Sequence, residues 1–243
     1  MKVSFVILTW NRYKFLERCI QELVNSIDDE LNSEIIVMDN GSTDKTPEVL
    51  NRFVNNNLVK IIRRKKNYGL NAYKKLFKQA SGEYVVIVDD DVLNFPKSVD
   101  KIFIDYMTSF QDYGFLALNV IQNEFTNGAK PEPSFYVDDT KEDKTIEQGP
   151  TGGWCSCFRV KDYSKIRLRF LFTNLNMKRG EDGLITKLLY KKLGLKSGII
   201  KKEYCFHACG PYYAKEFGHL DREIEKYKNS GLKNFIDIYK QYK

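Results

Sequence analysis

Short apolar segments alternate with helical segments through the first 120 residues of this 243-residue chain. The apolar run at 84–88 is mostly β-branched, which is typical of a strand buried on both faces. Strict alternation with short connections predicts an α/β fold, in which helices cover both faces of a parallel sheet. We expect strands at 3–8, 34–38, 58–62, 84–88 and 115–120, and helices at 12–26, 67–79 and 96–110. A further helix should follow residue 44, capped by Ser42 or Asp44, with Pro47 in its first turn.

The alternation loosens after residue 120. Residues 122–148 are polar and too long for a simple connection, so we expect a loop there that is mobile or is ordered by a ligand. The remaining elements that we expect are strands at 151–160 and 196–200, a helix at 181–193, and one or two amphipathic helices at 211–243 with a break near Gly231.

Polar residues follow the first four predicted strands at the point where each strand ends. These residues lie at 9–11 (Thr-Trp-Asn), 39–42 (Asp-Asn-Gly-Ser), 67–69 (Asn-Tyr-Gly) and 89–91 (Asp-Asp-Asp). In open α/β sheets, ligands bind at the carboxyl ends of the strands. We therefore expect the four loops to converge on one crevice.

The three consecutive carboxylates at 89–91 demand positive charge nearby, because adjacent acids at the mouth of a core repel one another. A hard divalent cation meets this need, since Mg²⁺ and Mn²⁺ take one or two carboxylates and complete their shell with water and phosphate oxygens. The alternative is a helix-capping acid with two solvated neighbours ahead of Pro96. The triplet favours a metal-bound phosphate ligand.

The net charge of +7 is unevenly distributed. Residues 60–78 hold eight Lys or Arg and no acid, and residues 161–202 hold twelve Lys or Arg against three acids. This pattern fits either an anionic partner or solvated helices that keep the protein soluble. The apolar run at 3–8 is far shorter than the roughly 20 residues of a spanning helix. Five cysteines without an export signal suit a reduced compartment, so we expect a cytoplasmic protein.

Four motifs, in this order and spacing, resemble the family 2 glycosyltransferases of the GT-A fold. They are FVILTWNR at 5–12, EIIVMDNGSTD at 34–44, the run from NYGLN to VDDD at 67–91, and GED at 180–182 followed by a basic strand and His207. The resemblance covers roughly residues 1–210. It implies a Rossmann-like, mostly parallel sheet flanked by helices, with a nucleotide-binding half at 1–120, an acceptor and catalytic half at 121–210, and a C-terminal helical extension at 211–243.

Such enzymes transfer a sugar from a nucleotide-diphosphate sugar to an acceptor hydroxyl, usually with inversion. The resemblance implies a UDP-sugar as the commonest donor and a glycan or lipid-linked saccharide as acceptor. Thr9, Asn11 and Asp39 would contact the nucleoside, with Asp39 reaching the base. The residues implied to line the nucleotide pocket are Asn67, Gly69 and Asn71.

The resemblance also gives the acidic triplet a role. Asp89 and Asp91 become a DxD pair for Mn²⁺ or Mg²⁺, with Asp91 as the direct ligand, and Asp90 is a candidate for the ribose. His207 matches a histidine that often supplies a further metal ligand. The cation would neutralise the leaving diphosphate.

Glu181 and Asp182 match the ED motif of the family, in which the aspartate is the catalytic base. An attacking hydroxyl must lose its proton, and a carboxylate within hydrogen-bond reach can accept it. We assign Asp182 as base and Glu181 as an acceptor or positioning contact, although the helix dipole also favours acids in a first turn. Gly153 and Trp154 fall where the family places the floor of the acceptor site, so Trp154 is a candidate sugar platform, with core packing as the alternative.

Three other interpretations remain open from the sequence. Cys155, Cys157, Cys205 and Cys209 with His207 could form a zinc site, although their spacing also fits core packing. The chain could be a non-catalytic module that binds anionic polymers, although we expect no nucleic acid. A metal-dependent phosphohydrolase or nucleotidyltransferase could use the same DxD pair.

Two surfaces suggest partners. The basic segment 187–202 could contact an anionic membrane where a lipid-linked acceptor waits, which would place the protein at the inner face of that membrane. The apolar faces of the helices at 211–243 could pack on the domain or form a dimer seam.

Overall fold

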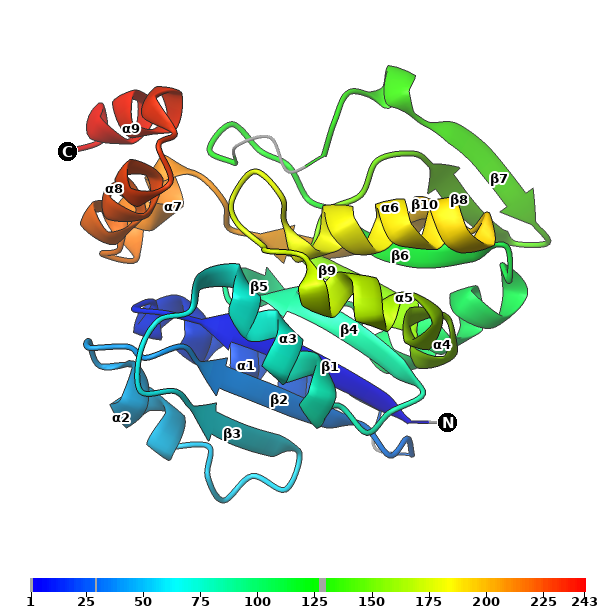
Figure 1. Ribbon diagram of the computed structural model, residues 1–243, viewed down its shortest axis with the longest axis horizontal. Coiled ribbons are helices and arrows are strands. Elements are labelled where there is room, and N and C mark those ends of the chain that lie inside the picture. Colours follow the sequence, from blue (N-terminus) through cyan, green and yellow to red (C-terminus); the bar gives the residue numbers. More distant parts are fainter. Residues whose placement is uncertain (1, 29, 127–129) are drawn as a thin grey trace.

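The computed structural model describes residues 2–28, 30–126 and 130–243. These residues form one twisted sheet with the strand order β3-β2-β1-β4-β9-β6-β10-β8-β7, and β5 pairs with β10 beside this path (Figure 1). The strands are β1 (Val3–Thr9), β2 (Glu34–Asp39), β3 (Val59–Arg63), β4 (Tyr84–Asp89), β5 (Val92–Asn94), β6 (Tyr113–Val120), β7 (Val137–Lys141), β8 (Lys144–Gln148), β9 (Cys155–Arg159) and β10 (Lys196–His207).

The six strands β1 to β4, β6 and β10 run in one direction, as the alternating pattern predicts. β1 pairs in parallel with β2 and β4, β2 with β3, and β6 with β10. β9 is antiparallel to both β4 and β6 and therefore separates the two parallel groups. The mostly parallel sheet is confirmed, and its single antiparallel insertion joins the two halves of the domain.

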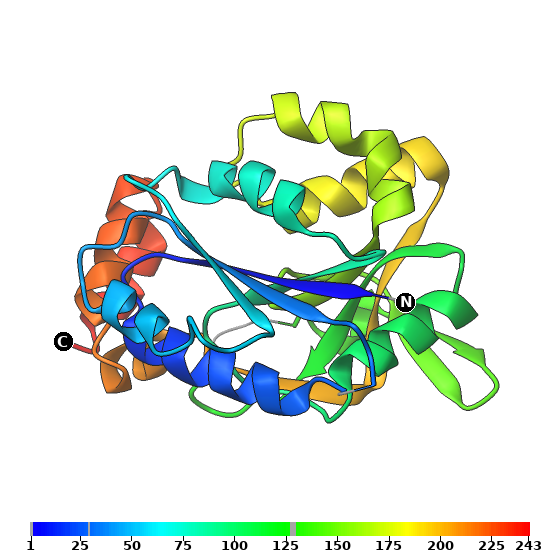
Figure 2. The same cartoon turned by 90° about the horizontal axis from the view of Figure 1, so that it is seen from below.

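Helices cover both faces of the sheet (Figure 2). One face carries α1 (Tyr13–Ser26), α2 (Thr46–Asn51) and α4 (Val99–Ser109), and the other carries α3 (Tyr73–Leu76), α5 (Val160–Phe172) and α6 (Glu181–Leu193). Alternate residues of β1 enter two separate cores, because successive side chains of a strand point to opposite faces. Phe5 packs with α1 and α4, and Val6 packs with α3, α5 and α6.

Several local predictions are wrong in detail. The predicted helix at 67–79 is α3 flanked by two 3-10 segments, Gly69–Ala72 and Phe77–Gln79. Neither Ser42 nor Asp44 is the N-cap of α2, which is Lys45. The predicted loop at 122–148 contains the β7–β8 hairpin, and its residues 127–129 lie outside the described residues. α5 directly follows β9 and was not predicted, and β10 continues beyond residue 200 as far as His207.

The C-terminal segment forms three helices, where the sequence predicted one or two: α7 (Pro211–Glu216), α8 (Leu220–Asn229) and α9 (Lys233–Lys240). They pack together around a small apolar cluster that includes Tyr227 and Tyr239, so much of the proposed dimer face is used within the chain. Figure 1 places them beside the carboxyl ends of the parallel strands. Phe217 stacks on Phe15 of α1, with ring centroids 4.2 Å apart.

His219 makes the docking of these helices sensitive to pH. Its side chain is buried between α8 and α1, with its ring centroid 5.3 Å from that of Phe15. Burial, and then repulsion from Arg12, lower the pKa of His219 to about 4. Protonation would therefore place a charge in a site that disfavours it.

We expect the free energy of unfolding to fall as the pH drops from about 6.5 to about 4, because the unfolded state then binds a proton that folded His219 does not. His219→Phe keeps an aromatic ring and removes this titration. As the pH falls across this window, wild type should lose on the order of 2 kcal/mol of stability relative to the variant, measured by urea unfolding. A difference that stays constant with pH would contradict the prediction.

Candidate active site

A cleft of about 1110 Å³ lies at the carboxyl ends of the parallel strands. It is bordered by the strand-end loops, the start of α6, the end of β10, and α8. The convergence that the sequence predicts is therefore confirmed for most of the candidate residues. Those that line the cleft are Thr9, Asn67, Gly69, Asp89, Asp90, Asp91, Glu181, Asp182 and His207.

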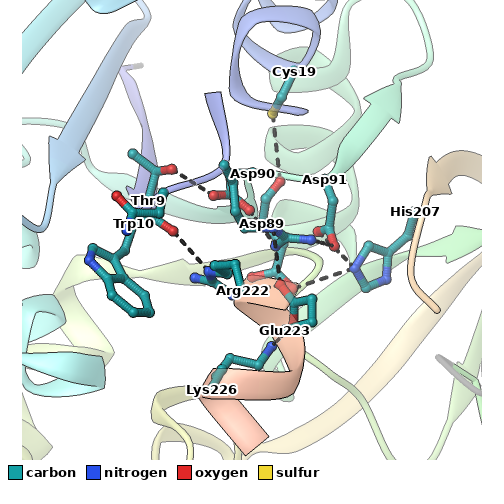
Figure 3. A network of polar contacts seen from close by, with 12 residues as sticks. Thr9, Trp10, Cys19, Asp89, Asp90, Asp91, His207, Arg222, Glu223 and Lys226 are labelled. Carbon is teal, nitrogen blue, oxygen red and sulfur yellow. Dashed lines mark hydrogen bonds and ion pairs between the residues drawn. The ribbon is translucent and has the colours of Figure 1, made fainter. Parts of the chain in front are cut away.

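Arg12 supplies the first positive charge for the acidic triplet. Its Nη1 donates to Oδ1 of Asp90 and its Nη2 donates to Oδ2 of Asp91, both at 2.6 Å. Asp90 also accepts a hydrogen bond of 2.7 Å from the hydroxyl of Thr9 (Figure 3). Both oxygens of Asp90 are thus engaged in a buried network, so this carboxylate fixes Arg12 and Thr9 instead of offering a free acceptor to a ribose.

Asp89, Asp91 and His207 form the one cluster in the described parts of the chain whose side chains could jointly hold a metal ion. Their ligand atoms lie within 4.8 Å of one another, and Nε2 of His207 is 3.1 Å from Oδ1 of Asp91 and 3.7 Å from Oδ2 of Asp89. Two carboxylates and an imidazole fit Mn²⁺ or Mg²⁺, which keep other positions for water or phosphate oxygens.

The charges in this cluster set opposite protonation preferences. Burial alone would raise the pKa of Asp91, but attraction to Arg12 and His207 lowers it well below its ordinary value. Partial burial and the neighbouring carboxylates raise the pKa of Asp89 to about 7 against the opposing attraction of His207, while 37% of its side chain stays exposed. Asp91 therefore stays ionised, and Asp89 is the group that gains most from an added cation.

α8 contributes charged residues that the sequence analysis missed. Glu223 is buried, and it binds Nε of Arg12 at 3.4 Å, Arg222 at 2.6 Å and Lys226 at 2.5 Å. Arg222 also donates a hydrogen bond of 3.0 Å to the carbonyl of Trp10 (Figure 3). Arg12 stands in the quoted FVILTWNR motif and could have been found there, but no local signal marks the α8 residues.

The loops after β2 and β3 are held together by Asn40. Its Nδ2 donates to Oδ1 of Asn67 at 2.9 Å and to the carbonyl of Gly69 at 3.1 Å, and its Oδ1 accepts from the amide of Tyr68. Gly41 has φ of +79°, and an added Cβ would lie 2.5 Å from the backbone of Lys66. Only glycine permits this close approach of the two loops.

Three of the predicted nucleotide contacts bind neighbouring loops within the protein. Asn11 accepts from the amide of Thr43 at 2.8 Å, and Oδ1 of Asp39 accepts from the amide of Ser42 at 2.9 Å. Asn71 binds the segment between α5 and α6 through the carbonyl of Leu175 at 3.0 Å. These side chains shape the loops that line the cleft, and they are absent from its described lining.

The acid pair at the start of α6 lines the same cleft and lies close enough to Asp89 for their charges to interact. Burial, and then Asp182 and Asp89, raise the pKa of Glu181 well above its ordinary value. Burial also raises the pKa of Asp182, but the amide of Gly183 opposes this shift by donating to Oδ1 at 2.6 Å. Gly153 packs against the pair, and a Cβ there would lie 3.2 Å from Oε1 of Glu181.

Trp154 does not offer a platform in this structure. The indole is 4% exposed, packs in the core, and donates from Nε1 to the carbonyl of Leu118 at 2.9 Å. The role of sugar platform is therefore withdrawn in favour of core packing.

The zinc interpretation is likewise not supported among the described residues. The metal-competent cluster there contains no cysteine. Cys155, Cys157 and Cys205 are buried in the apolar core, where burial raises the pKa of each thiol. Thiols that resist ionisation are poor zinc ligands.

Removing the Arg12 charge should destabilise the fold. Arg12→Met leaves Asp90 and Asp91 buried without a guanidinium, which we expect to lower the free energy of unfolding by about 3 kcal/mol. The loss should be smaller at about pH 5 than at about pH 8, because protonation relieves the unpaired acids. Urea unfolding of this variant beside Lys14→Met, at an exposed neighbour, measures both effects. Equal losses in the two variants would refute the role of Arg12.

Known proteins resemble this chain in sequence. Residues 4–167 match the family model described as "Glycosyl transferase family 2". A dolichol-phosphate mannosyltransferase of Pyrococcus furiosus is 38% identical over 103 residues, which are 42% of this chain and 29% of that protein. The poly(ribitol-phosphate) β-N-acetylglucosaminyltransferase TarS of Staphylococcus aureus is 22% identical over 85% of this chain and 35% of its own length. The chain spans less than half the length of these relatives.

Solved structures resemble its fold. The structure of S. aureus TarS 1–349 aligns with all of this chain and 71% of that chain, with a TM-score of 0.65 and 18% identity. The mannosyltransferase PcManGT of Pyrobaculum calidifontis, in complex with GDP-Man and Mn²⁺, aligns with 92% of this chain and 64% of that chain, with a TM-score of 0.62 and 15% identity. The expected GT-A architecture is confirmed. Because the family model covers more than half of this chain, the chain belongs to glycosyl transferase family 2.

Proposed function

We propose that the chain transfers a sugar from a nucleotide-diphosphate sugar to an acceptor hydroxyl, with inversion, in the presence of Mn²⁺ or Mg²⁺. The observation that carries this proposal is that two acidic groups line one cleft. One group is Asp89 and Asp91 with His207, and the other is Glu181 and Asp182. Such an arrangement gives the leaving diphosphate and the attacking hydroxyl separate partners.

Asp91, Asp89 and His207 would hold the cation, with Asp91 as the direct carboxylate ligand. The bound cation would supply electrostatic stabilisation to the diphosphate as it leaves. Without the cation, Arg12 keeps Asp91 ionised through its contact of 2.6 Å with Oδ2, while Oδ1 of Asp91 faces His207. The proposed metal ligands are therefore held in place by contacts within the protein before any ligand enters.

Asp182 is the proposed base. Glu181 is buried and has its pKa raised well above normal, so when the pair holds a single proton we place it on Glu181. Asp182 is less buried and accepts a hydrogen bond from the amide of Gly183, which favours its ionised form. Glu181 would then position the acceptor as a hydrogen-bond donor, while Asp182 takes the hydroxyl proton.

The loops after β1, β2 and β3 would bind the nucleoside. Asn67 and Gly69 line the cleft, and Asp39, which is buried at the end of β2, is the proposed contact to the base. Asn11 and Asn71 would act by holding these loops in place. UDP is the nucleotide that we propose first, supported by the fold shared with TarS, which has been solved with UDP-GlcNAc. The GDP-Man complex of PcManGT makes GDP the main competitor.

The acceptor that we propose is a glycan or a lipid-linked saccharide. The relatives support this choice through their printed names, which include a dolichol-phosphate mannosyltransferase and poly(ribitol-phosphate) transferases. No helix in the described ranges is long and apolar enough to cross a bilayer.

Donor binding should depend on metal and on Asp91. A cognate nucleotide diphosphate or nucleotide sugar should raise the melting temperature by several degrees with Mn²⁺ or Mg²⁺, because a ligand that binds only the folded state stabilises it. The shift should vanish with chelator and in Asp91→Asn. Asp143→Asn, in an exposed turn, is the matched control. If no nucleotide shifts the wild type, the transferase proposal fails and an anionic-polymer module becomes the better account.

Loss of the base should separate chemistry from binding. Asp182→Asn should reduce sugar transfer by about 10²–10⁴-fold, the usual contribution of a general base, while the nucleotide-induced thermal shift is retained. Glu181→Gln should cause a smaller loss. Product analysis with the cognate donor also tests the alternative reaction. Release of nucleoside monophosphate and sugar phosphate without a glycosylated acceptor, at a rate indifferent to Asp182→Asn, would identify a phosphohydrolase.

A further inference from the structure

Two neighbouring helices expose apolar side chains far from the cleft interior. Leu168 and Phe172 on α5 are 72% and 88% exposed, and Tyr190 on α6 is 66% exposed. We define the α5–α6 face by these three residues together with Lys165, Arg169 and Lys191, all of them exposed. Exposed aromatic and aliphatic groups of this size within a basic surface are unusual, and they indicate an interaction site.

The helical geometry places these side chains together. Leu168 and Phe172 are four residues apart on α5 and therefore share one side of the helix with Lys165. α6 packs beside α5, and Nζ of Lys192 donates to the carbonyl of Lys165 at 2.7 Å. Figure 2 shows α5, in yellow-green, as the outermost helix over this side of the sheet. α5 therefore lies at the outside of the molecule on this side of the sheet, and its exposed side chains are accessible to a partner.

The exposed charged residues of α5, α6 and the segment between them are all basic. From Val160 to Leu193, every exposed charged residue is Lys or Arg. The acids of this stretch are turned inward: Asp162 is buried against Arg159 at 2.6 Å, and Glu181 and Asp182 face the cleft. Within the described parts of the chain, none of the exposed bases of this stretch forms an ion pair. Their charge is therefore available to an external anionic surface.

The face also adjoins the opening of the cleft. α5 ends at Phe172, and the segment that follows reaches the cleft within a few residues, where Met177 and Lys178 are part of the lining. Asn71 holds this segment in place through the carbonyl of Leu175. A surface that contacts the α5–α6 face would therefore lie beside the entrance to the proposed active site.

We infer that the α5–α6 face binds the surface of an anionic lipid bilayer, with Leu168 and Phe172 inserted and the surrounding bases at the headgroups. An almost fully exposed phenylalanine suits insertion between lipids, and the surrounding Lys and Arg suit anionic headgroups. A second copy of the chain that presents the same face is disfavoured, because two such basic faces would repel each other.

The proposed membrane contact lies on α5 and α6, whereas the sequence suggested the segment 187–202. The later part of that segment belongs to β10, where Lys196 pairs with Asp112 at 3.0 Å and Lys201 pairs with Asp138. Those bases are already neutralised by acids of the fold. The contact therefore combines α6 with α5, which the sequence analysis did not predict.

Vesicle flotation tests the inference without using any enzymatic activity, so its outcome is independent of the proposed function. The full chain is mixed with vesicles of phosphatidylcholine alone or of equal parts phosphatidylcholine and phosphatidylglycerol. We expect binding to the mixed vesicles only, with loss at about 0.5 M salt, because screening weakens charge attraction. Binding to both vesicle types alike, or to neither, would overturn the inference.

Two variants divide the apolar and basic contributions. Leu168→Ser with Phe172→Ser should lower partitioning to mixed vesicles about tenfold, and its control is Phe135→Ser with Val137→Ser at equally exposed positions. Lys165→Glu, Arg169→Glu and Lys191→Glu together should lower it further, whereas Lys14→Glu, Arg18→Glu and Lys97→Glu, outside the face and likewise exposed, should change it little. All four variants should keep the wild-type melting temperature within a few degrees.

A soluble polyanion is the competing partner, and single-stranded DNA serves as its probe. If DNA binds the wild type as tightly as mixed vesicles do, and the serine variant binds both normally, the face is a general polyanion surface and the membrane inference is wrong. Loss of vesicle binding in the serine variant, with any DNA binding unchanged, supports insertion into lipid.

Discussion

The balance of charge at the carboxyl end of β4 is the constraint on which the rest of the site depends. A strand buried on both faces delivers three carboxylates to one edge, and that edge is stable only if cations meet them there. Arg12 binds Asp90 and Asp91 from the loop after β1, and His207 approaches Asp89 and Asp91 from the end of β10. Glu223 then binds Arg12 from α8. Four segments that are distant in the chain are thus joined by alternating charges at a single point.

Local patterns were sufficient for the first half of the fold because its strands are contiguous, apolar and followed by short polar turns. They could not place β9, since periodicity identifies a strand but not its neighbours, and the pairing of Val86 with Cys157 that inserts β9 is a long-range choice. The β7–β8 hairpin was missed for a different reason. β7 is largely exposed and β8 buries only Thr145 and Ile146, so the polar and charged composition of both strands is that of a loop. Their pairing, through β8, to β10 is a long-range contact that this composition does not reveal.

The same distinction holds within the site. The acidic triplet and the Glu181–Asp182 pair could be predicted because each stands at the end of a strand or the start of a helix that the sequence defines. The α8 partners in this charge network could not, because contacts such as Arg12 with Glu223 join residues far apart in the chain. The orientation of Trp154 was equally hidden. Its indole is fixed by the carbonyl of Leu118 on a strand whose position next to β9 was unknown from sequence.

The C-terminal helices take part in the electrostatics of the cleft. Their own apolar cluster is small, and α8 meets the domain largely through charged contacts, in which Glu223 shares Arg12 with Asp90 and Asp91. Any ligand that brings positive charge beside Asp91 competes with Arg12 for that carboxylate and changes the strength of the ion pair between Arg12 and Glu223. Because such coupling is reciprocal, the docking of α8 must in turn alter the affinity of the cleft for that ligand. Loss of these helices would therefore change cation binding at the end of β4 even though every strand of the sheet remained.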